Sequence, residues 1–371
     1  MNSLLNRLGI QLPIIQAPMA GVSTPEMAAA VSNAGGLGSI GVGNVDAPAA
    51  QKMIAAIRER SDKPFNINVF CHPPATREPQ RESAWLKRLG PLFSQFNAQP
   101  PAALREIYTS FLTDDAMLSM LVEERPPVIS FHFGLPSRAA IQALQNAGVF
   151  LLATATNLAE AKAIHAAGID AIVAQGYEAG GHRGMFHLNV QDECLGTLAL
   201  TRLLANDSPI PIIAAGGIMD GAGIAAALAL GASAAQLGTA FILCPESLAD
   251  AGYRSALSNP SARHTVMTSA ISGRPARSLA NKFTALGEVV DQSVIPVYPV
   301  AYDAGKSLHA AAKKTGDFGY GAQWAGQAAG LSRSLPAAEL MNRLRLELNE
   351  AIAANADFRP PLDQPIQPYQ Q

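Results

Sequence analysis

Two glycine-ended stretches in the second half of the chain have the residue types that bind an anion. Residues 209–217 form an apolar run that closes with Gly216 and Gly217, and residues 234–238 form another that closes with Gly238. Glycine has no Cβ, so an anion can approach its backbone N–H group closely. An alanine-rich helix over about 221–230 is expected to join the two stretches. Together they predict a phosphate cradle made by two neighbouring strand ends.

A third glycine-rich stretch, residues 175–184, surrounds a histidine. Gly180 and Gly181 directly precede His182. We expect a flexible loop with exposed backbone at the catalytic face. Imidazole titrates near neutral pH, so His182 suits the role of a general base. The alternative is an ordinary connection whose histidine is solvated.

Two polar side chains interrupt apolar strands. His132 lies within the strand expected at 127–133, where it is either a hydrogen-bonded core residue or part of the active-site wall. Asn68 alternates with apolar residues in the strand expected at 65–70. A buried amide near the end of a strand costs free energy unless it is hydrogen-bonded. Asn68 is therefore predicted to contact a ligand.

A tyrosine and a lysine lie one helical turn apart in the last third of the chain. Tyr302 and Lys306 share a face of a helix that begins near Pro299, and Tyr298 precedes it. These side chains either line a pocket or form a solvated helix face. Tyr108 is a further candidate for the same pocket.

Several other kinds of chemistry are excluded. The seven histidines are scattered, and the sequence has neither a His-Glu-x-x-His nor a Gly-x-Ser-x-Gly motif. Gly36, Gly38 and Gly41 match a dinucleotide fingerprint, but they lie within an expected strand rather than in a turn that opens a helix. A phosphate site with one base and no metal indicates chemistry carried by an organic cofactor.

A repeat of strands and helices positions these residues. Helical patterns separate eight strand candidates, which is typical of a (β/α)8 TIM barrel. Phosphate sites of such barrels usually lie after strands 7 and 8, where the glycine-ended stretches fall. The candidates are 13–18, 36–42, 65–70, 127–133, 149–154, 171–176 and the two glycine-ended stretches.

Two interruptions of the repeat predict a second lobe. We expect a barrel that binds a phosphorylated cofactor at 1–70 and 127–244, and a mainly helical substrate or lid lobe at 71–126 and 245–330. Residues 331–371 are expected to form a C-terminal helix and an extended tail.

Composition narrows the class of protein. With 49% hydrophobic and 15% charged residues, the 371-residue chain can build a large core. A net charge of −2 favours neither nucleic acid nor an anionic membrane as a partner. Three dispersed cysteines and the lack of a signal peptide pattern favour a cytoplasmic location. The uncharged run 221–244 is expected to be buried in the barrel rather than in a membrane.

Six motifs, in order along nearly the whole chain, resemble those of the FMN-dependent nitronate monooxygenases, formerly called 2-nitropropane dioxygenases. The last motif, with Tyr298, Tyr302 and Lys306, resembles the class I branch. The motifs are QAPMAG at 16–21, NINVF at 66–70, AQGYEAGGHRG at 174–184, AAGGIMDG at 214–221, QLGT at 236–239 and GYGAQWAGQ at 319–327.

The resemblance implies roles for individual residues. The catalytic base would be His182, and the flavin ring would lie over Ala17, Pro18 and Met19. His132 is the second catalytic candidate, and either histidine could contact the reacting carbon. His132 would line the substrate cavity with Tyr108, Tyr298, Tyr302 and Lys306. The remaining FMN contacts would be Asn68, Gln175, Gly180, Gly181, Gly216, Gly217, Gln236, Leu237, Gly238 and Thr239, and no metal is expected.

The implied reaction is oxidation of an alkyl nitronate by O2 to a carbonyl compound and nitrite through an anionic flavosemiquinone. Propionate 3-nitronate, a toxic metabolite, is the expected substrate, and detoxification the expected role of a monomer or homodimer. Two alternatives remain: an FMN-dependent NAD(P)H:quinone or enoyl-thioester reductase, and a non-catalytic flavin-binding protein.

Overall fold

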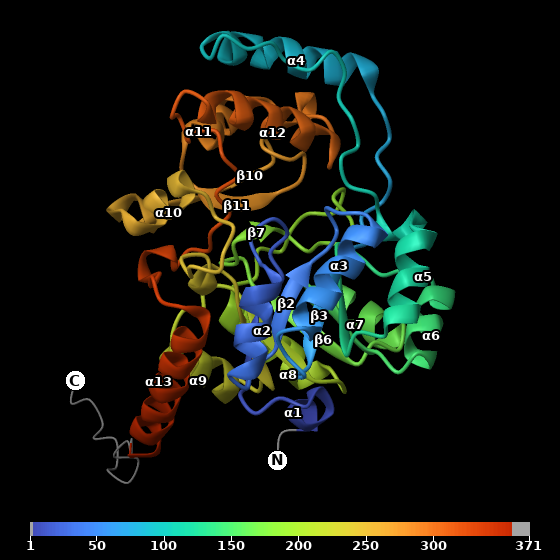
Figure 1. Cartoon of the computed structure of the whole chain (residues 1–371), viewed down its shortest axis with the longest axis vertical. Helices are drawn as coiled ribbons and strands as arrows, with labels where there is room; N and C mark the ends of the chain where they lie inside the picture. The colour runs from blue at the N-terminus through green and yellow to red at the C-terminus, as the bar shows by residue number, and fades with distance from the viewer. Residues whose placement is uncertain (1–2, 358–371) are drawn as a thin grey trace, which may run out of the picture.

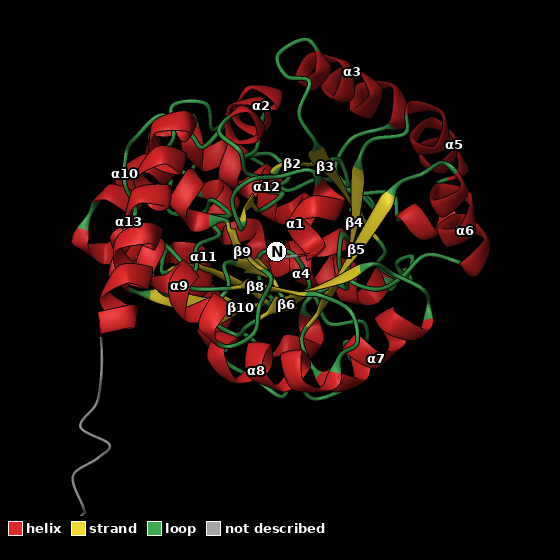
Figure 2. Ribbon diagram, turned by 90° about the horizontal axis from the view of Figure 1, so that it is seen from below, coloured by secondary structure: helices red, strands yellow, loops and turns green. Residues whose placement is uncertain are grey.

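A closed barrel of parallel strands forms the centre of the protein in a computed structural model that describes residues 3–357 (Figures 1 and 2). Its 8-stranded sheet has the order β1-β9-β8-β6-β5-β4-β3-β2. The N–H of Leu37 donates to the carbonyl of Ile14 at 3.0 Å and closes the ring between β1 and β2. The predicted (β/α)8 barrel is confirmed. The strands are β1 (Ile14–Gln16), β2 (Gly38–Gly41), β3 (Phe65–Phe70), β4 (Val128–His132), β5 (Phe150–Ala155), β6 (Ala171–Gln175), β8 (Ile212–Ala215) and β9 (Ala234–Leu237).

An outer layer of helices follows the strands. Local sequence sets their ends: the Thr24 side chain caps α2 by accepting from the N–H of Met27, and Pro25 occupies the first turn. Gly148 and Gly168 end α6 and α7 at φ +83° and +81°, the left-handed conformation that glycine adopts readily after a helix. The outer helices are α2 (Pro25–Asn33), α3 (Ala47–Arg58), α5 (Asp115–Glu124), α6 (Arg138–Asn146), α7 (Leu158–Ala166), α8 (Thr197–Asp207), α9 (Gly221–Ala229) and α13 (Ala337–Asp357).

Two of these helices, α5 and α13, pack on the barrel at the ends of the two long insertions that follow β3 and β9. α5 packs against α3 and α6, outside the lobe to which its sequence position assigned it, because Met117 and Leu121 bury an apolar face there. α13 packs against α9 and α2 and covers the outside of the barrel, so it completes the β/α unit that begins at β9. The tail expected beyond α13 lies outside the described residues.

The two insertions form a lobe over the carboxyl ends of the strands, at the top of Figure 1. Trp85 and Phe93 from the first insertion share one buried core with Phe283 and Leu308 from the second. The lobe and its connections contain α4 (Pro79–Ser94), η1 (Phe111–Thr113), η2 (Thr239–Phe241), α10 (Ala251–Ser258), η3 (Pro260–Arg263), β10 (Thr265–Thr268), β11 (Ala276–Leu279), α11 (Lys282–Val289), η4 (Gln292–Val294), α12 (Val300–Lys313) and η5 (Ala329–Leu331).

The glycine-rich loop after β6 contains a short strand, β7 (Gly181–His182). It pairs antiparallel with β11, with His182 opposite Ala276 and Gly181 opposite Arg277. The expectation of a flexible loop therefore differs from the structure, because this backbone is fixed to the lobe by a sheet. A two-residue strand carries no periodic signal from which it could be predicted.

The N-terminal end of the barrel is closed by α1 (Ser3–Leu8), which Figure 2 shows at the centre of the ring. Leu4 and Leu8 pack there against Ile15 and Val173 inside the barrel. Across residues 3–357, no helix is both long and apolar enough to span a membrane. The uncharged run 221–244 folds as α9, β9 and η2, as expected.

Candidate active site

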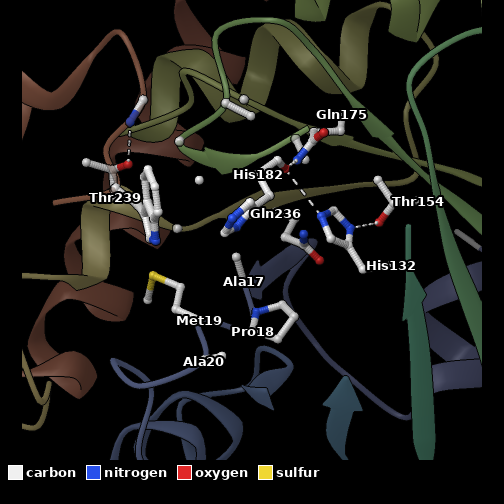
Figure 3. Close-up of a pocket in the computed structure, with 18 of the residues that line it drawn as sticks. Ala17, Pro18, Met19, Ala20, His132, Thr154, Gln175, His182, Gln236 and Thr239 are labelled. Carbon is white, nitrogen blue, oxygen red and sulfur yellow. Dashed lines mark hydrogen bonds between the residues drawn. The ribbon is translucent and has the colours of Figure 1, made fainter. Parts of the chain in front are cut away.

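A cavity lies between the carboxyl ends of the barrel strands and the lobe (Figure 3). Because the strands are parallel, their ends bring residues that are distant in sequence to one place. Most of the predicted site residues line this cavity. They are Ala17, Pro18, Met19, Asn68, Tyr108, His132, Gln175, Gly180, Gly181, His182, Gly216, Gly217, Gln236, Gly238, Thr239, Tyr298 and Tyr302.

Two predicted residues lie beside the cavity rather than in its wall. The Leu237 side chain is buried with Phe241 and Leu344 in the core between the barrel and its outer helices. Lys306 is exposed, and its Nζ lies 5.0 Å from the ring centroid of Tyr108 and 5.2 Å from that of Tyr302. Its ammonium group therefore lies behind the tyrosine wall, in cation–π contact with two of its rings.

The ends of β8 and β9 form a glycine cradle. Gly216 and Gly217 have φ of +124° and +69°. No acceptor within residues 3–357 is hydrogen-bonded to the backbone N–H of Gly217 or Gly238. A Cβ at Gly180, which lines the same cavity, would lie 2.6 Å from the N of Gly326, so this position has room only for glycine. Free N–H groups in such a concave turn fit a phosphate group.

The loop after β1 forms an apolar floor. Ala17, Pro18 and Met19 lie along one side of the cavity in Figure 3. Ser23 fixes this loop, because its Oγ accepts from the N–H of Met19 at 3.0 Å and from Nε2 of Gln16 at 2.9 Å. The floor is thus held in place before any ligand binds.

His132 has both ring nitrogens engaged. Its Nε2 lies 3.3 Å from the carbonyl oxygen of His182, and its Nδ1 lies 3.0 Å from Oγ1 of Thr154 (Figure 3). A carbonyl only accepts, so this network assigns the proton to Nε2 and makes Nδ1 the acceptor for Thr154. Gln175 Nε2 donates to the same carbonyl at 3.0 Å. His132 and Gln175 therefore support the backbone of His182.

His182 has one ring nitrogen engaged. Its Nε2 lies 2.9 Å from Oγ of Ser272, and that hydroxyl donates to the carbonyl of Arg274 at 3.2 Å. The hydroxyl proton is used there, so the network places a proton on Nε2 of His182 and leaves a lone pair on Nδ1. Within the described chain, no group is hydrogen-bonded to Nδ1.

Burial keeps the histidines of this site neutral. The pKa of His182 is well below its usual value because the ring is desolvated and because Arg274, His132 and His72 lie near it. The same causes, burial first and Arg274 second, lower the pKa of His132 to about 3 and that of His72 to about 4. A neutral imidazole can accept a proton across the physiological pH range.

Aromatic side chains form the side of the cavity that faces the lobe. The ring centroid of His182 lies 5.3 Å from that of Tyr298 and 5.0 Å from that of Trp324. Trp324 Nε1 donates to the hydroxyl of Tyr302 at 3.2 Å. The Tyr298 hydroxyl is buried and has no partner within the described chain, so it is free to donate to a ligand.

Sequence reasoning missed several residues of the wall. Trp324 belongs to the motif at 319–327, which offered a signal, but it was not assigned to the site. Ser272 contacts His182 from a turn with no motif, so no local signal pointed to it. Further lining residues that were not predicted include Phe70, Phe133, Thr154, Met219, Ile242 and Tyr253.

Comparisons of the sequence with known proteins match nitronate monooxygenases over most of the chain. A family model described as nitronate monooxygenase matches residues 2–347. A nitronate monooxygenase of Paraburkholderia phytofirmans is 62% identical over 356 residues, covering 96% of this chain and 97% of that protein. One of Pseudomonas aeruginosa is 55% identical over 341 residues, covering 92% and 97%.

Solved structures extend the comparison to the fold. A nitroalkane oxidase from Streptomyces ansochromogenes superposes with a TM-score of 0.88 at 40% identity, covering 95% of this chain and 100% of that one. FabK from Thermotoga maritima superposes with a TM-score of 0.72 at 30% identity, covering 95% and 97%.

Proposed function

Because this chain belongs to the nitronate monooxygenase family, whose members are flavoproteins, we propose that its cavity binds FMN and oxidises alkyl nitronates with O2 to a carbonyl compound and nitrite. The observation that carries the proposal is the glycine cradle of Gly216, Gly217 and Gly238, which opens into the same cavity as His182.

The residues of the cavity fit FMN. The cradle offers backbone N–H groups to the phosphate, and Ala17, Pro18 and Met19 offer an apolar floor to the ring system. Asn68 donates to the carbonyl and hydroxyl oxygens of Ser130 at 3.0 and 2.9 Å, which orients its own amide oxygen for a ligand donor. When bound, FMN would supply the one-electron oxidation chemistry and the route to O2.

The tyrosine wall suits an anionic substrate. The buried Tyr298 hydroxyl can donate to a nitronate oxygen, and burial raises the pKa of Tyr302 to about 12, so that its hydroxyl keeps its proton. Lys306 adds a positive charge behind this wall. We propose propionate 3-nitronate as the substrate, because it is an anion that these groups would attract.

His182 allows a second class of substrate. A neutral nitroalkane must lose its α-proton before it becomes a nitronate. The free lone pair on Nδ1 of His182 would accept that proton, while Ser272 holds Nε2. His132, whose two nitrogens are already engaged, would position His182 rather than act as the base.

The experiment that tests this function compares two electron donors. The purified FMN-loaded protein is mixed without oxygen with propionate 3-nitronate or with NADH, and flavin absorbance is followed. We expect a rapid change with the nitronate and a slow one or none with NADH. Rapid bleaching by NADH together with no response to the nitronate would overturn the proposal.

The second candidate is a flavin-dependent reductase. The sequence leaves this interpretation open, and the NADH arm of the experiment tests it. A purely flavin-storing protein is disfavoured, because His182 lines the cavity beside the flavin floor.

A further inference from the structure

Arg274 is a buried cation close to His182. Its side chain is 1% exposed, and none of the carboxylates in residues 3–357 lies within ion-pair distance of it. Burial lowers the pKa of Arg274 to about 10, and Tyr298 and the Glu160 carboxylate, which lies beyond ion-pair distance, offset this effect only in part. Such a group is expected to be retained for a reason other than stability.

The contacts of Arg274 fix the segment that carries His182. Its Nε donates to the carbonyl of Arg183 at 3.2 Å, and its Nη2 donates to the carbonyl of Met185. These acceptors follow His182 by one and three residues. The carbonyl of Arg274 itself accepts from Ser272, the residue that binds Nε2 of His182. One turn, 272–274, therefore holds both the ring and the backbone of His182.

A strained aromatic residue separates the guanidinium from the cavity. The Arg274 Cζ lies 4.1 Å above the ring centroid of Phe133. Phe133 has a φ of +76°, a conformation that a bulky residue adopts only where its surroundings impose it. Its ring centroid lies 4.3 Å from that of His132 and 5.8 Å from that of His182. The charge of Arg274 thus reaches both histidines across one apolar ring.

The other groups around His182 do not cancel this charge. Arg183 is paired with Asp192, at 2.7 Å. The oxygens of Glu160 accept from the N–H groups of Thr156 and Phe186, and this carboxylate raises the pKa of Arg274 from beyond ion-pair distance without neutralising it. The remaining titratable groups near His182 are His132, His72, Tyr298 and Tyr302, and burial keeps all four neutral at pH 7.

We propose that Arg274 is a positioning residue for His182: its charge, which no ion pair neutralises, favours the neutral, proton-accepting form of the imidazole, and its guanidinium holds the backbone on which that imidazole stands. This inference rests on the proposed function of His182 as a base. After burial, Arg274 is the largest cause of the low pKa of His182. Without Arg274, the imidazole would take up a proton at higher pH and would lose its lone pair on Nδ1.

Two substitutions separate the charge of Arg274 from its hydrogen bonds. Arg274→Gln keeps a donor without the charge, whereas Arg274→Lys keeps the charge. The rate constant kcat/KM for a neutral nitroalkane is measured from pH 5 to pH 9 with the FMN-loaded proteins. We expect the acid limb of the Arg274→Gln profile to lie about one pH unit higher than that of the wild type, since one nearby like charge accounts for about one unit of pKa. At pH values below both limbs, the variant should therefore be about tenfold less active than the wild type. Arg274→Lys should keep the wild-type profile.

A second readout does not depend on turnover. Histidine ring resonances of the ¹³C-labelled holoenzyme are titrated by NMR, with His182 assigned through His182→Asn. The ring should titrate at higher pH in Arg274→Gln than in the wild type. Arg277→Gln is the matched control: Arg277 is also buried, but it donates to the carbonyl of Tyr177, and we expect no change in the titration of His182.

The outcomes separate the inference from the function. An unchanged titration of His182 in Arg274→Gln, or an equal loss in the Gln and Lys variants at every pH, would overturn the role of the charge. If the wild type oxidises no nitro compound, the proposed function is wrong. The NMR titration still shows whether Arg274 lowers the pKa of His182. If Arg274→Gln does not fold, titration of wild-type His182 near its ordinary pKa would refute the proposal.

Discussion

His182 and His132 lie on the same cavity wall, yet their hydrogen bonds give them different roles. His132 uses one nitrogen for the carbonyl of His182 and the other for Thr154. His182 uses only Nε2, for Ser272. Proton transfer needs a nitrogen whose lone pair is free. The proposal that His182 is the base therefore rests on the hydrogen-bond network rather than on the pKa values, which are low for both histidines.

Replacing His182, the proposed base, should affect neutral nitroalkanes and preformed nitronates differently. In His182→Asn, kcat/KM for a neutral nitroalkane should fall about 10²- to 10⁴-fold, the usual contribution of a general base. Turnover of a preformed nitronate should fall far less, because its α-proton is already lost. Steady-state nitrite release measures both. The exposed His187, replaced in the same way, is the control. Full nitroalkane turnover by His182→Asn would exclude His182 as the base.

At the scale of the elements, the turn after β8 has a backbone conformation that favours glycine. Gly217 has a φ of +69°, and a Cβ there would lie 3.2 Å from Cβ of Glu178. Gly217→Ala should therefore distort the cradle and weaken FMN binding about tenfold, which corresponds to about 1.4 kcal/mol. Quenching of FMN fluorescence on titration with the apoprotein gives the Kd.

Gly148→Ala is the control for this turn. Gly148 has a similar φ of +83°, but a Cβ there would contact nothing within 4 Å, and it lies at the end of α6. The Gly148→Ala variant should have a lower free energy of unfolding because of backbone strain, and it should bind FMN with the wild-type affinity. An equal Kd for the wild type and Gly217→Ala would show that the turn does not hold the cofactor.

The helix α13 should behave as part of the barrel rather than as an appendage. Leu344 is fully buried against the outer helices, whereas Leu346 on the same helix is 40% exposed. Leu344→Ala should lower the free energy of unfolding by about 2–5 kcal/mol, and Leu346→Ala by much less. Urea unfolding of the two variants makes the comparison. Similar losses would mean that α13 does not share the core.

Elements with a local signal could be predicted from the sequence. Apolar runs separated by helical patterns indicated the barrel strands, and Thr24 and Asp46, which cap α2 and α3, are residue types that favour helix starts. Gly216 and Gly217 marked the cradle because only glycine tolerates that backbone.

Long-range arrangements had no such signal. The return of α13 to the barrel depends on packing across an intervening lobe, and the pairing of β7 with β11 involves two residues of each strand. Ser272 and Arg274 lie about 90 positions after His182 in the sequence. Ser272 contacts the ring of His182, and Arg274 donates to the carbonyl of the next residue, Arg183. Only the folded chain brings these groups together.

At the scale of the whole molecule, buried neutral histidines make the protein sensitive to acid. His132 and His72 have pKa values of about 3 and 4 when folded, and about 6.5 when unfolded. The unfolded state therefore binds more protons below pH 6.5. Their stabilising effect is complete above that pH and is lost as the pH falls toward 4, by up to about 1.4 kcal/mol per pH unit for each histidine.

Urea unfolding at pH 7, 6 and 5 tests this dependence. The free energy of unfolding should fall at each step, and it should fall less steeply in His72→Gln, which removes one of the titrating groups. A stability that stays constant between pH 7 and pH 5 would contradict the account of the buried histidines.

The barrel supplies the cradle and the floor, and the lobe supplies Ser272, Trp324 and the tyrosines, so the cavity needs both. The most direct test of its function is simultaneous measurement of O2 consumption and nitrite release when the FMN-loaded protein meets propionate 3-nitronate in air. We predict that nitrite appears as O2 is consumed. No nitrite from this nitronate or from other alkyl nitronates, under conditions where NADH and a quinone are turned over, would contradict the account.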